Sequence, residues 1–135
     1  MASIKTQILS IVIGEGASGG ALGIGLCDKM IMLENTWFSV ISPEGCASIL
    51  WKDSSKAPEA AKSLKLTPKD LMEHDICNMI VYEPYGGAHR HFDSTADILK
   101  ETILSEIKEL QKNLSNDFLE SRVSRYDKLG VFRED

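Results

Sequence analysis

The chain has 135 residues, with 15 Lys or Arg against 20 Asp or Glu, so its formal net charge is −5. This acidic balance argues against nucleic acid as the main partner, because such a binder needs a basic surface to displace counterions. Hydrophobic residues make up 43% and charged residues 26%, which excludes a disordered chain. The length suits a single domain with its own core.

Three further features predict a cytoplasmic protein. The longest apolar runs, IVI at residues 11–13 and MIML at residues 30–33, are too short to span a bilayer. The first residues, MASIKTQIL, lack the long apolar stretch of a signal peptide. Cys27, Cys46 and Cys77 form no CxxC pair, and their odd number favours reduced thiols.

The first third of the chain predicts short strands around one glycine-rich helix. Residues 8–13 are apolar at nearly every position, which is typical of a strand buried on both faces. A glycine turn at 14–16 ends this strand, and residues 18–27 predict a helix of small side chains. Glycines within that helix each cost up to about 1 kcal/mol relative to Ala, so we expect another group to approach its backbone closely. Residues 29–34 and 37–41 predict two more strands.

The remainder is mainly helical by its sequence signals. Pro43 suits the first turn of a helix that continues to Trp51, and a second helix is predicted at 54–65. Thr67 and Pro68 open a third helix, residues 79–82 predict a last strand, and residues 86–90 predict a loop.

Helices are predicted from about residue 93 to 130. The first carries an apolar stripe with charged residues, Glu106 among them, outside it. The stripe consists of Leu99, Ile103, Ile107, Leu110 and Leu114. Residues 115–117 are expected to cap the final helix, on which Arg122, Arg125 and Lys128 predict a solvated basic face, with a subunit contact as the alternative.

The segment GEGASGG at residues 14–20 matches two side-chain motifs. Its glycines fit G-x-G-x-x-G, and Glu34 lies twenty residues after Gly14, as in dinucleotide-binding turns. The segment also fits G-x-S-x-G, with Ser18 as nucleophile and Asp70 or Asp75 and His89 or His91 as partners. The first pattern is weak because glycine-rich turns are common, and a nucleotide-binding fold needs further alternating strand–helix units, whereas the chain after Ile41 is mostly helical. For the second, we favour Ser18 as a helix cap.

A third interpretation uses only the backbone. Unpaired N–H groups at a helix N-terminus can stabilise a developing anion, and glycines let a reacting oxygen reach them. This explains Gly19 and Gly20 better than capping does. The alternative is that the glycines only permit close packing between helix and strand, and spacing alone does not decide between the two.

Three sequence blocks carry a family resemblance. VIGEGASGGALGIGLCDK (residues 12–29), SVISPEGCASILWKDSSKAPEAA (39–61) and EPYGGAHR (83–90) closely resemble the alpha subunit of acetyl-coenzyme A carboxylase carboxyltransferase. The resemblance extends to about residues 125–126 and implies an α/β, crotonase-like fold, a partial superhelix of strand–strand–helix units with a helical C-terminal region.

The resemblance also implies a reaction, in which a carboxyl group passes from carboxybiotin on a biotin carboxyl carrier protein to acetyl-CoA. The product is malonyl-CoA, formed in the first committed step of fatty acid synthesis. Carried over by motif, Gly19 and Gly20 would present N–H groups to the biotin ureido oxygen. The implied partners are the beta subunit, which holds a structural zinc, and biotin carboxylase, with an alpha2-beta2 core. The implied location is a bacterial cytoplasm or, as the alternative, a plastid.

The chain departs from the family's pattern in three ways. The family's upstream part is missing, Gln7 stands where a proline usually precedes the strand, and the last helix is about a turn short. We therefore expect residues 1–135 to be the C-terminal portion of a carboxyltransferase domain, arising from a truncated gene, a mis-called start or a fragment. The alternatives are a non-catalytic remnant that binds the beta subunit and a serine hydrolase using Ser18.

Other candidate residues have simpler explanations. His89 and His91 form an H-x-H pair without a third ligand at a useful spacing, so no metal site is predicted in this chain. Cys46 is interpreted as a buried small hydrophobe rather than a nucleophile. Trp37 and Trp51 are interpreted as core or interface anchors.

Overall fold

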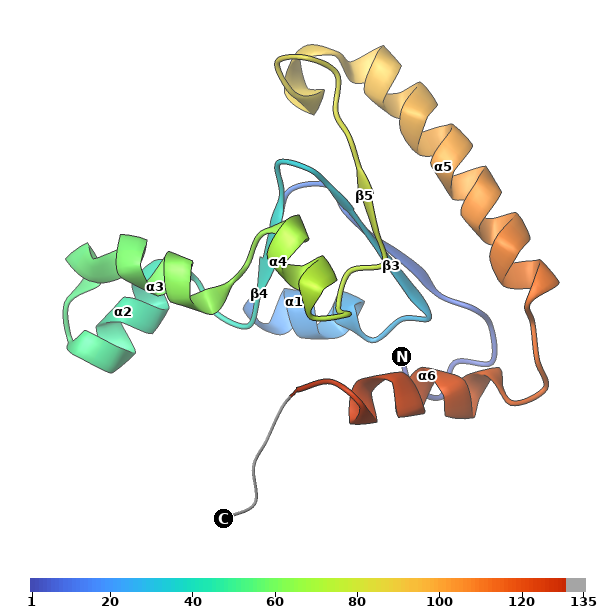
Figure 1. Cartoon of the computed structure of the whole chain (residues 1–135), viewed down its shortest axis with the longest axis horizontal. Helices are drawn as coiled ribbons and strands as arrows, with labels where there is room; N and C mark the ends of the chain where they lie inside the picture. Colours follow the sequence, from blue (N-terminus) through green and yellow to red (C-terminus); the bar gives the residue numbers. More distant parts are fainter. Residues whose placement is uncertain (131–135) are drawn as a thin grey trace.

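The first half of the chain repeats one unit, in which two short strands precede a helix. The structure is a computed structural model that describes residues 1–130. The first unit consists of β1 (Leu9–Val12), β2 (Glu15–Ala17) and α1 (Ser18–Gly25). The second consists of β3 (Lys29–Leu33), β4 (Trp37–Ser39) and α2 (Pro43–Trp51) (Figure 1). The other elements are η1 (Ser54–Lys56), α3 (Ala57–Leu64), α4 (Pro68–Glu73), β5 (Met79–Val81), η2 (Ala88–Arg90), α5 (Phe92–Lys112) and α6 (Phe118–Asp127).

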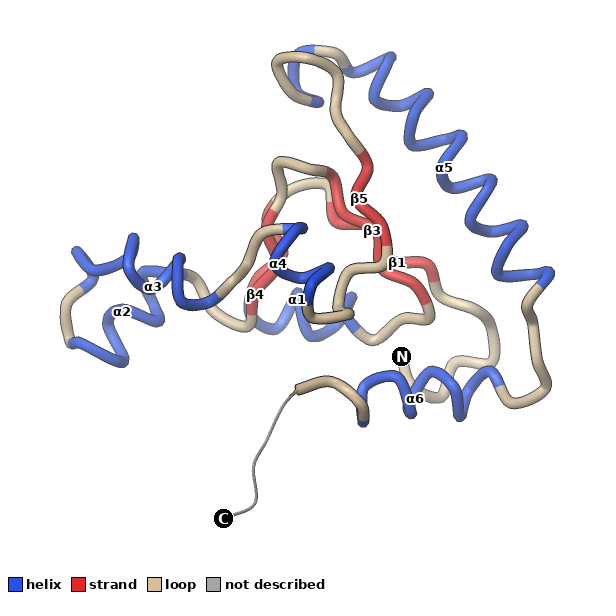
Figure 2. Tube along the Cα trace, viewed as in Figure 1, coloured by secondary structure: helices blue, strands red, loops and turns tan. Residues whose placement is uncertain are grey.

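Equivalent strands of successive units pair with each other, which produces two small parallel sheets (Figure 2). The first strands form a sheet in the order β1-β3-β5, with Ile31 opposite both Ile11 and Met79. The second strands, β2 and β4, pair separately, with Gly16 opposite Phe38. Residues 29–34 and 37–41 therefore contain strands, as predicted, and each strand belongs to a different sheet. The mixed α/β class is confirmed.

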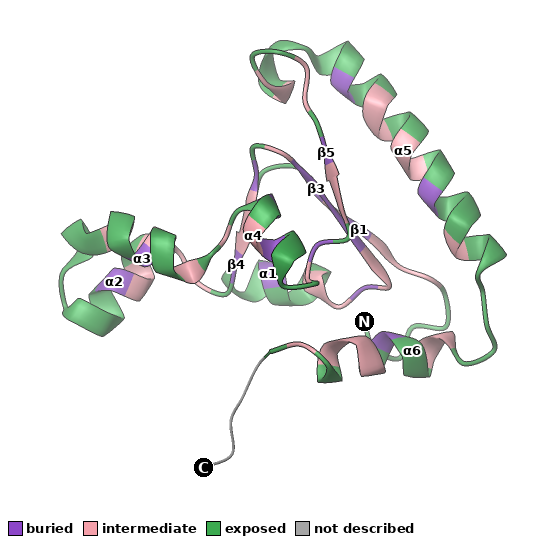
Figure 3. Ribbon diagram, viewed as in Figure 1, coloured by how far each residue is buried: buried purple, intermediate pink, exposed green. Residues whose placement is uncertain are grey.

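The core lies on β3, the central strand of the larger sheet, where four consecutive residues from Met30 to Leu33 are buried (Figure 3). The strand predicted at residues 8–13 is present as β1, but the prediction that it is buried on both faces is wrong. In β1 only Ser10 and Val12 are buried, and Ile13 is 66% exposed. The difference follows from position, because β1 is an edge strand of this sheet and alternates between covered and open faces.

The helices in the middle of the chain begin where their caps predict. Pro43 occupies the first turn of α2, and Ser42 Oγ accepts a hydrogen bond of 3.2 Å from Gly45 N. At α4, Thr67 and Asp70 form a capping box, in which each side chain bonds the other residue's backbone N–H. The starts of α2 and α4 therefore follow from N-cap side chains and a proline in the first turn, both of which are visible in the sequence.

The long helix α5 lies along one side of the structure (Figure 1) and packs Ile98 and Leu99 against the core. Glu106, which the apolar stripe places outside, is only 4% exposed, so that prediction is wrong. Its carboxylate forms an ion pair with Lys29 at the start of β3, and Glu109 Oε2 lies 2.9 Å from the same Lys29 Nζ. The Glu106 carboxylate is therefore buried because it pairs with Lys29. A contact between two distant residues cannot be predicted from the spacing of apolar residues along a helix.

The basic residues of α6 are also placed differently from the solvated face predicted for them. Arg122 is 1% exposed, and its guanidinium binds both carboxylate oxygens of Asp28, at 3.0 and 2.8 Å. It also donates to the carbonyl oxygens of Met1, Ile4 and Thr6 at 2.6 to 3.1 Å. The cation is buried because a carboxylate and several carbonyls replace its water.

Two other basic residues at the end of α6, Arg125 and Lys128, differ in their exposure to solvent. Arg125 is half-buried and donates to Asp28 O and Ile76 O, both at 2.8 Å, so it also departs from the solvated face. Lys128 is exposed. Asp117 stands at the N-cap position, within the predicted residues 115–117, but its side chain makes no capping bond within residues 1–130, so the predicted cap is wrong. Packing through arginines, rather than a local cap, holds this helix.

Substituting Arg122 tests whether this buried cation supports the fold. Arg122→Met leaves the Asp28 carboxylate in a largely buried position without its partner, which costs about 3–5 kcal/mol. We expect urea unfolding to show this loss in the free energy of unfolding. Arg90→Met, at an exposed arginine, is the control and should change that free energy by less than about 0.5 kcal/mol. Equal, small effects of the two substitutions would contradict the assignment.

Candidate functional site

The glycine-rich segment at residues 14–20 forms β2 and the first turn of α1. Its first part is a strand rather than the break that the glycines predict, because β2 gains a hydrogen-bonded parallel partner in β4. Glycine has a low intrinsic preference for strands, so β2 forms because it pairs with β4. The segment therefore passes directly from a strand into a helix.

The N-terminus of α1 is open. Ala17 stands at the N-cap position with an extended backbone, and no side chain among residues 1–130 caps the helix. The predicted capping role of Ser18 is therefore wrong. Ser18 is the first helical residue and has φ of +56°, a left-handed conformation that is uncommon for serine. Gly19 and Gly20 are exposed, and backbone N–H groups in a first helical turn have no partner within the helix.

Some glycines of this segment and of α1 are required by close packing, whereas others have free space around them. A Cβ atom on Gly16 would lie 2.8 Å from Phe38 Cδ2, and one on Gly25 would lie 3.1 Å from Phe38 Cζ. These two glycines allow α1 and β2 to pack against β4. A Cβ atom on Gly19, Gly20 or Gly23 would meet nothing within 4 Å. Packing inside this chain therefore leaves Gly19 and Gly20 unexplained.

Exposed aliphatic side chains lie on or beside the elements that form and flank this segment. Ile13 precedes β2, Val40 follows β4, and Leu22 lies on α1; they are 66%, 78% and 80% exposed. We call these three residues the aliphatic rim. An exposed apolar surface of this kind is typical of a place where another molecule binds. Sequence patterns did not single out these residues, because each looks locally like a core position.

The residues of the two side-chain motifs are not brought together. Within residues 1–130, Ser18 forms no side-chain hydrogen bond with His89 or His91, and both histidines are exposed. Asp70 belongs to the capping box of α4. Glu34, the proposed ribose ligand, instead accepts a hydrogen bond of 2.7 Å from Glu83 N. The geometry gives the hydrolase and dinucleotide interpretations no support.

Glu34 and Glu83 instead join two loops. Glu83 Oε1 accepts from Asn35 N at 3.1 Å and Oε2 accepts from Ala88 N at 2.6 Å, so each glutamate binds the other's loop. Burial raises the pKa of Glu83, but the hydrogen bonds from Ala88 and Asn35, with the nearby His89, outweigh burial and lower it. A hollow of about 630 Å³ lies against these loops. The Glu34 and Glu83 carboxylates beside this hollow already accept hydrogen bonds from backbone N–H groups.

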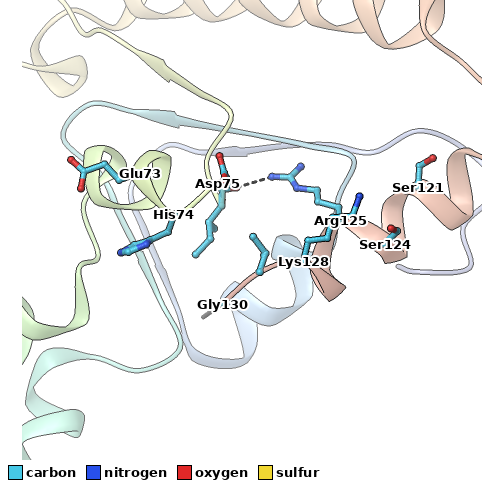
Figure 4. Close-up of a pocket in the computed structure, with 10 residues that line it drawn as sticks. Glu73, His74, Asp75, Ser121, Ser124, Arg125, Lys128 and Gly130 are labelled. Atoms are coloured by element: carbon cyan, nitrogen blue, oxygen red, sulfur yellow. Dashed lines mark hydrogen bonds between the residues drawn. The ribbon is translucent and has the colours of Figure 1, made fainter. Parts of the chain in front are cut away.

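A second hollow, of about 870 Å³, lies between α6 and the turn that follows α4 (Figure 4). Arg125 points across it to the backbone of that turn, where it donates to Ile76 O. The same guanidinium also binds Asp28 O. The Arg125 guanidinium in this hollow therefore serves the fold, because its hydrogen bonds go to backbone carbonyls.

The described part of the chain contains no evident metal centre and has two buried free thiols. No three His, Cys, Asp or Glu side chains gather there in a way that could hold a metal ion. Cys27 and Cys77 are buried free thiols, whereas Cys46, predicted to be buried, is half-buried on α2. None of the helices within residues 1–130 combines the length and apolar character needed to cross a bilayer.

Comparison with known proteins identifies the family. A family model described as acetyl co-enzyme A carboxylase carboxyltransferase-like matches residues 1–130. The chain belongs to this carboxyltransferase family. It is 44% identical over 134 residues to the acetyl-coenzyme A carboxylase carboxyl transferase subunit alpha of Staphylococcus haemolyticus. It is 49% and 47% identical, each over 132 residues, to the proteins of the same name in Fusobacterium nucleatum and Clostridium beijerinckii.

These relatives are considerably longer than the family member described here. The alignments include 98–99% of this chain, but only 42% of the Staphylococcus and Fusobacterium proteins and 48% of the Clostridium protein. The chain thus spans less than half the length of these relatives. The open end of α1 lies within the matched region.

Two glycine substitutions test the distinction between packed and open positions. Gly23→Ala introduces a methyl group into free space and a better helix former, so the free energy of unfolding should rise by about 1 kcal/mol. Gly16→Ala forces its methyl group against Phe38 and should lower that free energy by about 1–3 kcal/mol. Denaturant unfolding measures both. Effects of the same sign would contradict the assignment.

The lowered pKa of Glu83 predicts a dependence of stability on acid. Its contribution is fully present above the ordinary glutamate pKa of 4.5 and is lost as pH falls through the lower folded value. The difference in unfolding free energy between wild type and Glu83→Gln should therefore shrink below about pH 4.5. Urea unfolding from pH 7 to pH 3 measures it, with exposed Glu101→Gln as control. A pH-independent difference would show that Glu83 ionisation does not hold the loops.

Proposed function

We propose that this chain contributes to a carboxyltransferase that moves a carboxyl group from carboxybiotin to acetyl-CoA, forming malonyl-CoA. Membership of the family supports the reaction class. The observation that carries the proposal for this chain is the open N-terminus of α1, where Gly19 and Gly20 are exposed and packing does not require them. The substrates are carboxybiotin on a separate carrier protein and acetyl-CoA.

The proposed role of Gly19 and Gly20 is electrostatic. When biotin gives up its carboxyl group, negative charge develops on the ureido oxygen. Backbone N–H groups at the start of a helix, together with the helix dipole, stabilise an anion that reaches them. Side chains at both positions would stand between such an oxygen and the backbone. The free space around both glycines is consistent with the close approach of a planar ureido group.

We further propose that the chain forms the C-terminal portion of a crotonase-like carboxyltransferase domain. The support is its repeat of strand–strand–helix units, in which equivalent strands pair in parallel. The second unit begins with β3 and is followed, after α4, by β5 in the same sheet as β1 and β3. In this arrangement the helix of each unit follows the second strand, and α1 presents its N-terminus immediately after β2.

The proposed partners are a beta subunit that binds acetyl-CoA and zinc, a biotin carboxyl carrier protein, and biotin carboxylase in the wider complex, around an alpha2-beta2 core. The aliphatic rim supports a partner close to the site, because its three side chains expose apolar surface to water in the isolated chain. A protein surface placed over the rim would also exclude water from the glycine amides, which strengthens their effect on charge.

A second candidate is a non-catalytic role, in which the chain only binds the beta subunit. The aliphatic rim and further exposed apolar residues on α2, Ile49 and Leu50, favour binding without requiring chemistry. Co-purification with the beta subunit in the absence of malonyl-CoA formation would support this second candidate. The catalytic and the binding role therefore differ in whether malonyl-CoA forms when the chain is bound to the beta subunit.

Substitution of the two glycines tests the catalytic proposal. In a complex with the beta subunit and carboxylated carrier, Gly19→Ala and Gly20→Ala should each lower the rate of malonyl-CoA formation roughly 10²-fold. Because a Cβ at either position meets nothing within 4 Å, the fold and the assembly should persist. The control is Gly23→Ala, which lies one turn further along α1, where its N–H bonds within the helix.

The assay separates three outcomes. Loss of rate for Gly19→Ala and Gly20→Ala with retention for Gly23→Ala supports the amide role. Unchanged rates for all three variants would contradict it. A wild-type chain that raises the rate no further than the beta subunit alone would contradict catalysis by this chain and favour the binding role.

A further inference from the structure

One face of α6 contacts the end of α1 that lies opposite the open glycine amides. Arg122, Arg125 and Tyr126 are spaced by three and four residues, which places them on neighbouring positions of one helical surface. All three bond to the turn that joins α1 to β3. Arg122 binds the Asp28 carboxylate, Arg125 binds Asp28 O, and Tyr126 binds the backbone around Cys27.

The Tyr126 hydroxyl closes the C-terminal end of α1. It accepts a hydrogen bond of 2.8 Å from Cys27 N and lies within hydrogen-bonding distance of the Gly25 and Cys27 carbonyl oxygens. Its single proton can serve one of these carbonyls at a time. The last carbonyls of a helix lack intrahelical partners, so the tyrosine supplies a cap from a residue about 100 positions away. Cys27 itself is fully buried.

Helix α1 depends on such external support. It is eight residues long, four of them glycine, and each interior glycine disfavours helix by up to about 1 kcal/mol. Only Ala21 of its residues is buried, and the N-terminal end has no side-chain cap within residues 1–130. A short helix with an open N-terminus and little buried surface depends on contacts at its C-terminal end, where Ser10 Oγ of β1 also donates to Ile24 O at 2.7 Å.

We propose that Tyr126 is a positioning residue, which holds α1 by its C-terminal turn so that the Gly19 and Gly20 amides stay fixed for carboxyl transfer. This role rests on the proposed function. The residue acts through α1 and touches no reacting atom. The mechanism is preorganisation, because N–H donors stabilise a developing charge only when they are already in place.

The test is Tyr126→Phe, which removes the hydroxyl and retains the ring. Amide hydrogen exchange in the full chain should accelerate about tenfold for the helical amides of α1, while the amides of β3 remain as slow as in wild type. In the complex with the beta subunit and carboxylated carrier, kcat for malonyl-CoA formation should fall roughly tenfold, with KM for acetyl-CoA unchanged.

Two control variants make the result specific. Tyr82→Phe removes the hydroxyl of a tyrosine that is 68% exposed and should alter neither exchange nor kcat. Val81→Ala truncates a buried residue of β5, in a core cluster that α1 does not join, and shows the effect of general destabilisation. In that variant the amides of β3 should accelerate at least as much as those of α1.

The outcomes separate this role from the proposed function. Selective acceleration in α1 supports positioning. Equal acceleration of α1 and β3 in Tyr126→Phe, or no acceleration, overturns it, as does an unchanged kcat in an active complex. If the wild-type complex forms no malonyl-CoA, the proposed function fails, and selective exchange in α1 then supports Tyr126 as the residue that holds the helix.

Discussion

The arrangement of the chain depends on a buried cation, Arg122, whose guanidinium meets Asp28 and the backbone of the first six residues. This contact joins segments more than 90 positions apart in the sequence. Asp28 Oδ2 in turn accepts a hydrogen bond of 2.6 Å from Ile8 N, directly before β1. One ion pair therefore places α6, the N-terminal segment and the α1–β3 turn together. Removing either charge leaves the other buried, so the pair constrains the fold more strongly than a surface salt bridge does.

The same constraint reaches the proposed site through α1. The C-terminal turn of the helix is fixed by Tyr126 and by the residues next to Asp28, whereas its N-terminal turn is open. Gly16 and Gly25 are explained by Phe38, which occupies the space that their side chains would need. Gly19 and Gly20 have no such neighbour. A helix held at one end and left accessible at the other is suited to present backbone amides to a substrate that arrives from outside the chain.

Much of the fold follows from local sequence signals. The caps at Ser42 and Thr67 fix the starts of α2 and α4, and the apolar run from Met30 to Leu33 identifies the central strand. The failures have a common physical cause, since they concern contacts between distant residues. Glu106 and Arg122 are buried because each meets an opposite charge contributed by the α1–β3 region. The strand β2 exists because β4 pairs with it. For the site, the sequence identified the glycine turn, but only the structure distinguished its packed glycines from its open ones.

The Gly19 and Gly20 amides are the groups proposed to receive the biotin ureido oxygen. The most direct measurement is a titration of the isotope-labelled chain with biotin, in which backbone amide resonances are followed by NMR. Binding at these amides should cause concentration-dependent downfield shifts of the Gly19 and Gly20 amide protons, with little change at Gly86 and Gly87 in the loop after β5. Unmoved resonances at both Gly19 and Gly20, or equal shifts at all four glycines, would contradict it.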